Sequence, residues 1–179
     1  MSAPSPFSLT HSPQIPELLA KMKCSIAITT YQAGKLVLIS PKDENFLSQL
    51  PRTLDKPMGI ASTDDGEKIA IATKDEIIVF KNSSDLAKFY PKGPGKYDAM
   101  YFPRVTFHTC ALDIHDLAFG EDGELYGVNT LFSCISKFTD EYNFEVYWKP
   151  DFISKITSED RCHLNGMCME GGKPRYASA

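Results

Sequence analysis

The chain has 179 residues, 42% of them hydrophobic, and a formal net charge of −4 at pH 7. This composition supplies ample apolar material for a core and is typical of a soluble globular protein. The mild acidity argues against nucleic acid as a partner, which requires clustered Lys and Arg, and no apolar run approaches the roughly 20 residues of a membrane helix. Because the opening sequence lacks the basic and apolar segments of a signal peptide, we expect a cytoplasmic protein without a nucleic-acid or membrane partner.

The first elements in chain order are an arm, a helix and a sheet. Residues 1–15 are rich in Ser and Pro, which predicts a flexible N-terminal arm. Pro16 suits the first turn of a short helix, in which Leu18, Leu19 and Met22 could share one face. Strands are expected over 25–31, 35–40 and 45–54, and together they make a first blade.

A repeat then defines the architecture. Met58, His115 and Asn165 open three similar stretches, 57 residues (58 to 115) and 50 residues (115 to 165) apart. Two of the stretches carry an Asp-Gly turn, at 65–66 and 122–123, which is a strong hairpin signal. Periods near 50 residues suit the four-stranded blades of a β-propeller. The sequence therefore predicts an all-β, propeller-like domain over 16–179, an open arc of about three antiparallel blades plus a partial fourth.

The spacing of 57 reflects an excursion over residues 85–102. Lysines alternate there with aromatic residues, a mixture that in a basic protein would suggest nucleic-acid binding. In this acidic chain we interpret it as a solvated loop followed by an aromatic strand. Alternating Phe144, Val146 and Trp148 then predict an outer strand of the third blade.

Five segments resemble the signature segments of an uncharacterised bacterial family. They are TYQAGKLVL (30–38), DAMYFPR (98–104), LDIHDL (112–117), VNTLFSC (128–134) and EDRCHLNG (159–166). Members of that family are conserved hypothetical proteins with a propeller-like fold, and some are joined to tetratricopeptide repeats. The resemblance implies no established activity. Since members are roughly twice as long, it does imply that this chain is an amino-terminal fragment and that tetratricopeptide-repeat proteins are possible partners.

A second resemblance concerns the dipeptide Asn165-Gly166. It is similar to the strand openings of calcium- or zinc-dependent lactonases of the gluconolactonase and regucalcin type, in which an Asn at this point faces the metal. The resemblance implies a possible divalent metal as cofactor, with Asn165 and His115 as candidate ligands.

The inner strands of propeller blades open around one mouth, so polar residues at these openings should converge. The candidates for catalysis are His115, Asp116 and Arg161, and those for ligand binding are Arg104, Asp113, Asn129, His163 and Asn165. His115 could act as a base near neutral pH, and Arg161 could hold a carboxylate or phosphate. The same residue types also serve as polar staples between blades, and for His115 and Asp116 both interpretations stay open.

The five cysteines are odd in number and include no Cys-x-x-Cys pair, so we expect free thiols that are mostly buried. A nucleophilic Cys134 would need a lowered pKa and a nearby base. A zinc centre from His108, Cys110, Cys162 and His163 is disfavoured because neighbouring side chains fit one tetrahedral ion poorly.

Two functional classes follow. The first is a propeller that binds a small molecule, or a protein or glycan partner, at a polar site in the channel mouth. The alternative is a metal-dependent hydrolase of the gluconolactonase and regucalcin type. A bound divalent ion at the mouth would favour the hydrolase.

Overall fold

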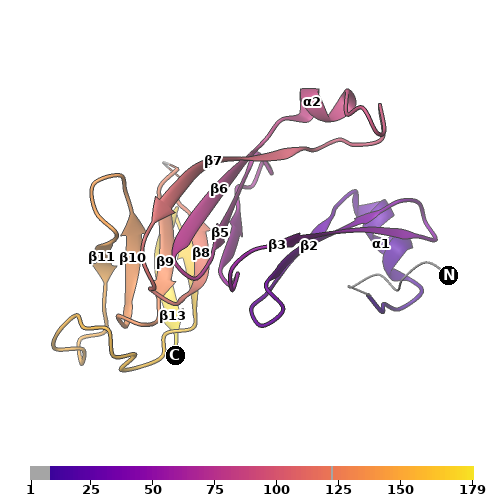
Figure 1. Cartoon of the computed structure of the whole chain (residues 1–179). Helices are drawn as coiled ribbons and strands as arrows, with labels where there is room; N and C mark the ends of the chain where they lie inside the picture. The colour runs from indigo at the N-terminus through magenta and orange to yellow at the C-terminus, as the bar shows by residue number, and fades with distance from the viewer. Residues whose placement is uncertain (1–8, 122) are drawn as a thin grey trace. The chain divides into compact units, whose positions relative to one another are not determined.

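The structure, a computed structural model, describes residues 9–121 and 123–179 (Figure 1). Most of the predicted arm, residues 1–8, and the middle of the predicted turn at 121–123 lie outside the described residues. The chain divides into two compact units, Met1–Pro57 and Met58–Ala179.

The first unit contains one helix and one sheet. The helix α1 (Ile15–Met22) precedes the antiparallel strands β1 (Ile26–Thr30), β2 (Lys35–Pro41) and β3 (Leu47–Thr53), in the order β1-β2-β3. Leu19 packs against Val37 and Ile39 of β2. Of the three residues predicted to share a helix face, Leu19 is buried, whereas Leu18 and Met22 are 49% and 63% exposed.

The second unit repeats a four-stranded antiparallel meander. The first copy consists of β4 (Ile60–Ser62), β5 (Lys68–Ala72), β6 (Glu76–Asn82) and β7 (Tyr101–His108), with α2 (Ser84–Lys88) between β6 and β7. The second consists of β8 (Ile114–Phe119), β9 (Leu125–Asn129), β10 (Cys134–Phe138) and β11 (Glu145–Trp148). The hairpin of β12 (Gly166–Glu170) and β13 (Lys173–Ser178) follows. Neither described helix is long and apolar enough to cross a membrane.

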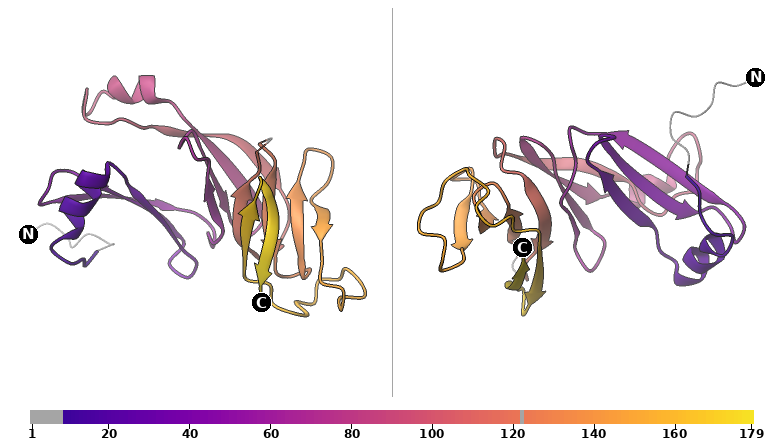
Figure 2. Two further views of the ribbon diagram at one scale, coloured as in Figure 1. Left: turned by 180° about the vertical axis from the view of Figure 1, so that it is seen from behind. Right: turned by 90° about the horizontal axis from the view of Figure 1, so that it is seen from below.

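The first strands of these sheets face one another, as inner strands of neighbouring blades do. Both β4 and β12 contact β8, and the Gly59 N–H donates to the Ile114 carbonyl at 3.2 Å. Figure 2 shows the successive sheets of this unit from two further sides. The chain is thus mostly β with antiparallel sheets, those of the second unit follow one another as propeller blades do, and the predicted fold class is confirmed.

The hairpin registers follow the repeat closely. In the second and third copies, the residue three positions after the opening residue pairs with the residue eleven positions after it. In the first copy the partner lies one residue further on. The pairs are Ala118 with Tyr126, Cys168 with Tyr176, and Ala61 with Ala70.

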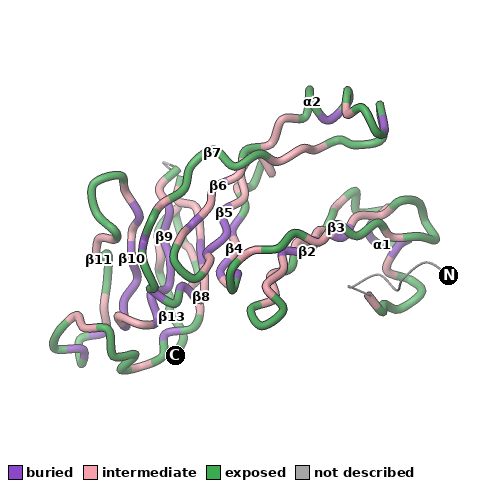
Figure 3. Tube along the Cα trace, in the orientation of Figure 1, coloured by how far each residue is buried: buried purple, intermediate pink, exposed green. Residues whose placement is uncertain are grey.

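The core of the second unit lies between its first two sheets. The main cluster joins Ala70 and Ile77 of one sheet to Leu117 and Leu125 of the next, and every residue of β9 is buried (Figure 3). A Cβ at Gly127 would lie 2.8 Å from the Phe138 ring, so only glycine fits there. Ile114, the first residue of β8, belongs to this core, so the packing holds in place the end of β8 at which the polar residues lie.

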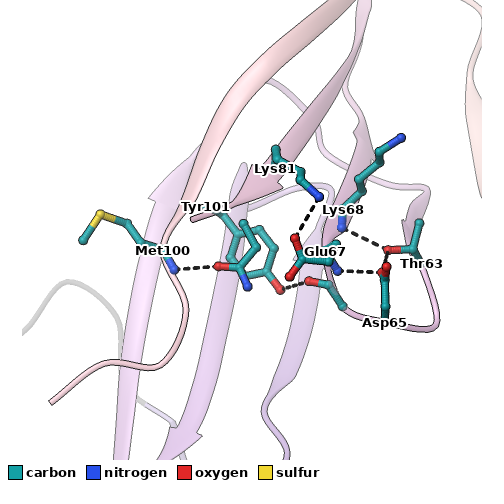
Figure 4. Close-up of polar contacts among 9 residues, drawn as sticks. Thr63, Asp65, Glu67, Lys68, Lys81, Met100 and Tyr101 are labelled. Atoms are coloured by element: carbon teal, nitrogen blue, oxygen red, sulfur yellow. Dashed lines mark hydrogen bonds and ion pairs between the residues drawn. The ribbon is translucent and has the colours of Figure 1, made fainter. Parts of the chain in front are cut away.

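Polar contacts tie the far end of the first four-stranded sheet (Figure 4). The Tyr101 hydroxyl of β7 donates to the Gly66 carbonyl in the β4–β5 turn at 2.6 Å, and Lys81 of β6 pairs with Glu67 at 2.8 Å. Asp65 accepts from the Glu67 N–H at 2.9 Å, and Gly66 has a positive φ of 67°. The Asp-Gly turn predicted at 65–66 therefore connects β4 to β5 and is contacted by side chains of β6 and β7.

Candidate functional site

His115 stands at the start of β8, and a polar side chain lies near each of its ring nitrogens. Its Nδ1 lies 3.0 Å from Oδ1 of Asn165, which directly precedes β12, and its Nε2 lies 3.5 Å from Oδ2 of Asp113. Because Oδ1 of an amide only accepts, Nδ1 carries the proton in the first contact. The ring is 14% exposed, and it connects two inner strands that lie 50 residues apart (115 to 165) in the chain.

His163 lies beside His115 and has its own carboxylate partner. The two rings meet edge to face, with centroids 5.1 Å apart and an angle of 87° between the planes. His163 Nδ1 lies 2.6 Å from Oδ2 of Asp160, and this contact, with a smaller contribution from Asp113, raises the pKa of His163 above its usual value. Asp160 is not among the residues predicted from the sequence, although its spacing of three residues from His163 could have indicated it.

Five residues therefore form one polar group, here called the histidine cluster: Asp113, His115, Asp160, His163 and Asn165. Three of the predicted ligand-binding residues and one predicted catalytic residue belong to it.

The loop after β9 holds both segments of the cluster. The Thr130 N–H donates to the Asp113 carbonyl at 3.3 Å, and the Asp160 N–H donates to the Leu131 carbonyl at 2.9 Å. The buried Thr130 hydroxyl also donates to the Leu164 carbonyl at 2.5 Å. The cluster is thus positioned by backbone contacts to one buried loop.

Asp116 lies next to the cluster and serves a different purpose. Its Oδ2 accepts the Met167 N–H of β12 at 2.9 Å, and its Oδ1 accepts the Leu117 N–H at 2.9 Å. The carboxylate therefore joins two inner strands, which is the polar staple that the sequence left open as one of two interpretations.

The Arg161 side chain is directed away from the cluster. Its guanidinium donates to Ser154 Oγ and to the Lys155 carbonyl, each at 3.4 Å, and it lies 3.9 Å from a Glu159 carboxylate oxygen. Its backbone N–H donates to Ser133 Oγ at 2.9 Å. Arg161 therefore braces its own loop.

Asn129 and Arg104 also lie outside the histidine cluster. Asn129 is fully buried, donates to Ser136 Oγ at 3.1 Å and accepts the Phe132 N–H at 3.1 Å. Arg104 is exposed on β7, the outermost strand of its sheet, three strands from β4. Only residues at the start of an inner strand are expected to converge at the channel mouth, and neither Asn129 nor Arg104 has that position.

The cysteines are free thiols, as predicted, but they are not mostly buried: Cys134 is buried, Cys24 and Cys162 are half-buried, and Cys110 and Cys168 are exposed. Cys134 is buried, and this burial raises the pKa of its thiol, which disfavours the nucleophilic thiolate. His108 pairs with Glu76 at 3.0 Å, while Cys110 accepts from Asn143 at 3.7 Å. Within residues 9–121 and 123–179, no three His, Cys, Asp or Glu residues are grouped so that they could hold a metal ion.

Fold and site together define a class: a propeller-like protein with a polar histidine cluster where its inner strands open. The chain belongs to the family described as Domain of unknown function (DUF4915), whose model matches residues 13–179. A comparison with curated proteins found no match.

Among solved structures, a functionally unknown protein from Desulfotomaculum acetoxidans is similar at 12% identity and a TM-score of 0.52, over 75% of this chain and 40% of that protein. A streptogramin B lyase matches at 17% identity and a TM-score of 0.48, over 80% of this chain and 40% of the lyase. An inactive virginiamycin B lyase from Staphylococcus aureus matches at 16% identity and a TM-score of 0.45, over 73% of this chain and 39% of the lyase. The chain thus spans about 40% of the length of these proteins, and the first similarity concerns the fold alone.

Proposed function

We propose that this chain is a ligand-binding propeller and that the histidine cluster is its binding site. One observation carries the proposal: Asp113, Asp160 and His163 all have left-handed backbone conformations, with φ of 54°, 46° and 48°. Such conformations are uncommon outside glycine, although Asp and His adopt them more readily than most residues. Among the described residues, seven besides glycine have a positive φ, and three of these lie in the cluster. Strained backbone of this kind gathers at binding and active sites. Each costs on the order of 1 kcal/mol and persists only where the surrounding structure holds it. The cluster is therefore arranged before any ligand binds.

The chemistry of the cluster favours a ligand with both hydrogen-bond donors and acceptors. The His163 side chain is 61% exposed, and its raised pKa favours the protonated ring, in which both nitrogens donate. The Asp113 side chain is 43% exposed and presents carboxylate acceptors. A polyhydroxylated small molecule, or the sugar of a glycan partner, satisfies both groups.

Histidine signals in NMR spectra test this proposal. We expect monosaccharides and sugar acids, added one at a time, to shift the ring signals of His115 and His163 in a saturable way. Asn165→Ala should abolish the shifts, because it releases the His115 ring. The matched control is His11→Ala, which removes an exposed imidazole far along the chain from the cluster and should leave binding intact. Saturable binding that survives Asn165→Ala and His163→Ala together would contradict the proposal.

A hydrolase is the second candidate, and the contact between Asp160 and His163 favours it. A carboxylate on Nδ1 leaves Nε2 of His163 to face a substrate or water, where the protonated ring, favoured by its raised pKa, would act as a general acid. Turnover of lactones or simple esters that falls sharply in both Asp160→Asn and His163→Ala would support this candidate. A metal-dependent form is not supported, since the described residues provide no set of metal ligands around Asn165, whose Oδ1 already contacts His115.

Three expectations from the sequence stay predictions. They are the cytoplasmic location, the partnership with tetratricopeptide-repeat proteins, and the origin of the chain as part of a longer protein.

A further inference from the structure

The excursion between β6 and β7, residues 84–100, folds as an ordered projection, here called the lysine lobe. Ala87 of α2 is fully buried, and the rings of Tyr90 and Tyr97 meet edge to face at 5.6 Å and 81°. Backbone hydrogen bonds close the turn, including one from the Gly95 N–H to the Lys88 carbonyl at 2.9 Å. A loop that merely connects two strands needs no such internal packing. Figure 1 shows the lobe at the end of the β6–β7 ribbon.

The lysine lobe exposes apolar and cationic side chains together. Leu86 and Phe89 are 56% and 78% exposed, and their spacing of three residues places them on one side of the α2 turn. Lys88 is paired with Asp85 at 3.2 Å, whereas Lys92 and Lys96 are exposed and form no ion pair with any residue that the structure describes. The lobe thus presents exposed apolar side chains beside cations.

A cleft of opposite character lies at the other end of β7. It has a volume of about 330 Å³ and is lined by residues 105–108 of β7 and residues 139–143 of the β10–β11 connection; it is here called the acidic cleft. Its lining includes the half-buried Phe107 ring and the Tyr142 ring, which is 65% exposed. Asp140 and Glu141 are exposed in the lining, and neither pairs with a cation among residues 9–121 and 123–179.

The two walls of the acidic cleft are joined. Nδ2 of Asn143 donates to the Thr109 carbonyl, one residue after β7, at 3.3 Å. The ring of Phe144 lies 5.0 Å from that of Phe132 and packs against the core, which anchors the connection. The cleft is therefore a preformed feature of the fold.

We propose that the lysine lobe of one copy of this chain binds the acidic cleft of a second copy. Charge complementarity supports this occupant. Two cations that form no ion pair with the described part of the chain would meet two anions that likewise form none there, with aromatic side chains beside both pairs. The lobe cannot fill its own cleft: it adjoins the first residue of β7 and the cleft the last four, and at about 3.3 Å per residue the strand holds the two apart. The contact joins different surfaces on the two copies, so it is heterologous.

Reciprocal charge reversal tests the contact. Sedimentation equilibrium at low ionic strength should show concentration-dependent association of the wild-type chain, weakened by added salt. The double variants Lys92→Glu/Lys96→Glu and Asp140→Lys/Glu141→Lys should each raise the dissociation constant by about tenfold or more, since like charges would meet. An equimolar mixture of the two variants should restore association, because each lobe then meets a cleft of opposite charge.

Controls separate this contact from other causes. Lys42→Glu/Lys155→Glu changes the net charge by the same amount at exposed lysines outside the lobe and should leave association unchanged. Phe89→Ala should weaken association without reversing a charge. Thermal melts of all variants should match the wild type, as is usual for surface substitutions. Three outcomes would each overturn the proposal. The wild-type chain could stay monomeric at every concentration, or the mixture of the two variants could stay dissociated. The charge variants could also associate as the wild type does, which is the result that pairing through the open edge of β13 would give.

Discussion

His163 is the residue whose titration reports most directly on the cluster. Its pKa is raised because Asp160 accepts from its ring and stabilises the charged form. A group with a raised folded-state pKa stabilises the fold below its unfolded pKa, and this contribution is lost as the pH rises through the folded pKa. The contact between Asp160 and His163 therefore stabilises the fold in mildly acidic and neutral solution, and this stabilisation is lost as the pH rises through the raised pKa of His163.

We expect Asp160→Asn to lower the pKa of His163 toward the ordinary histidine value, because the amide removes the negative charge. The His163 Cε1–H chemical shift, followed against pH, measures the change. Glu159→Gln is the matched control, since this neighbouring carboxylate approaches Arg161 instead. If His163 titrates at the same pH in Asp160→Asn and in the wild type, the assignment of Asp160 as the cause is wrong.

Among the elements, β8 and β12 are joined in part by the carboxylate of Asp116. Asp116 Oδ2 accepts a backbone N–H of β12, and loss of a partner for a partly buried donor costs about 1–3 kcal/mol. We expect Asp116→Ala to lower the free energy of unfolding by about 1–2 kcal/mol in urea titrations. Asp116→Asn, which keeps an acceptor oxygen, should lose less.

The comparison with His163→Ala distinguishes a structural role from a binding role. The His163 side chain is mostly exposed, so its removal should change unfolding by no more than about 0.5 kcal/mol while it abolishes ligand-induced shifts. Equal stability of Asp116→Ala and the wild type would exclude the staple role of Asp116.

At the scale of the whole molecule, the two units have separate cores. The cluster around Leu19, Val37 and Ile39 draws only on the first unit, and the two clusters of the second unit draw only on residues 58–179. We therefore expect a chain of residues 58–179 to fold alone, as compact units with their own cores do. Its amide and imidazole NMR signals should overlay those of the full chain at His115 and His163. A loss of signal dispersion in the shortened chain would show that the second unit needs the first.

The sequence by itself determined the blades, and it did so through local signals. The spacing of Met58, His115 and Asn165 and the Asp-Gly turn at 65–66 depend on hairpin geometry within a few residues, so they can be recognised without knowledge of the fold. The convergence of His115 with Asn165 also followed, because the register of a repeat determines which residues open each inner strand.

Only the tertiary structure decided which polar residues share the site. Asn129 donates to the buried Ser136 hydroxyl, and Arg161 donates to the Lys155 carbonyl of its own loop. Both side chains satisfy polar groups near them, so neither reaches the cluster. Asp160 joined the cluster through a left-handed backbone and a backbone contact with Leu131, and its spacing from His163 does not by itself specify either feature. Side-chain direction in loops depends on long-range hydrogen bonds, and for that physical reason the pattern located the region of the site while the packing selected its members.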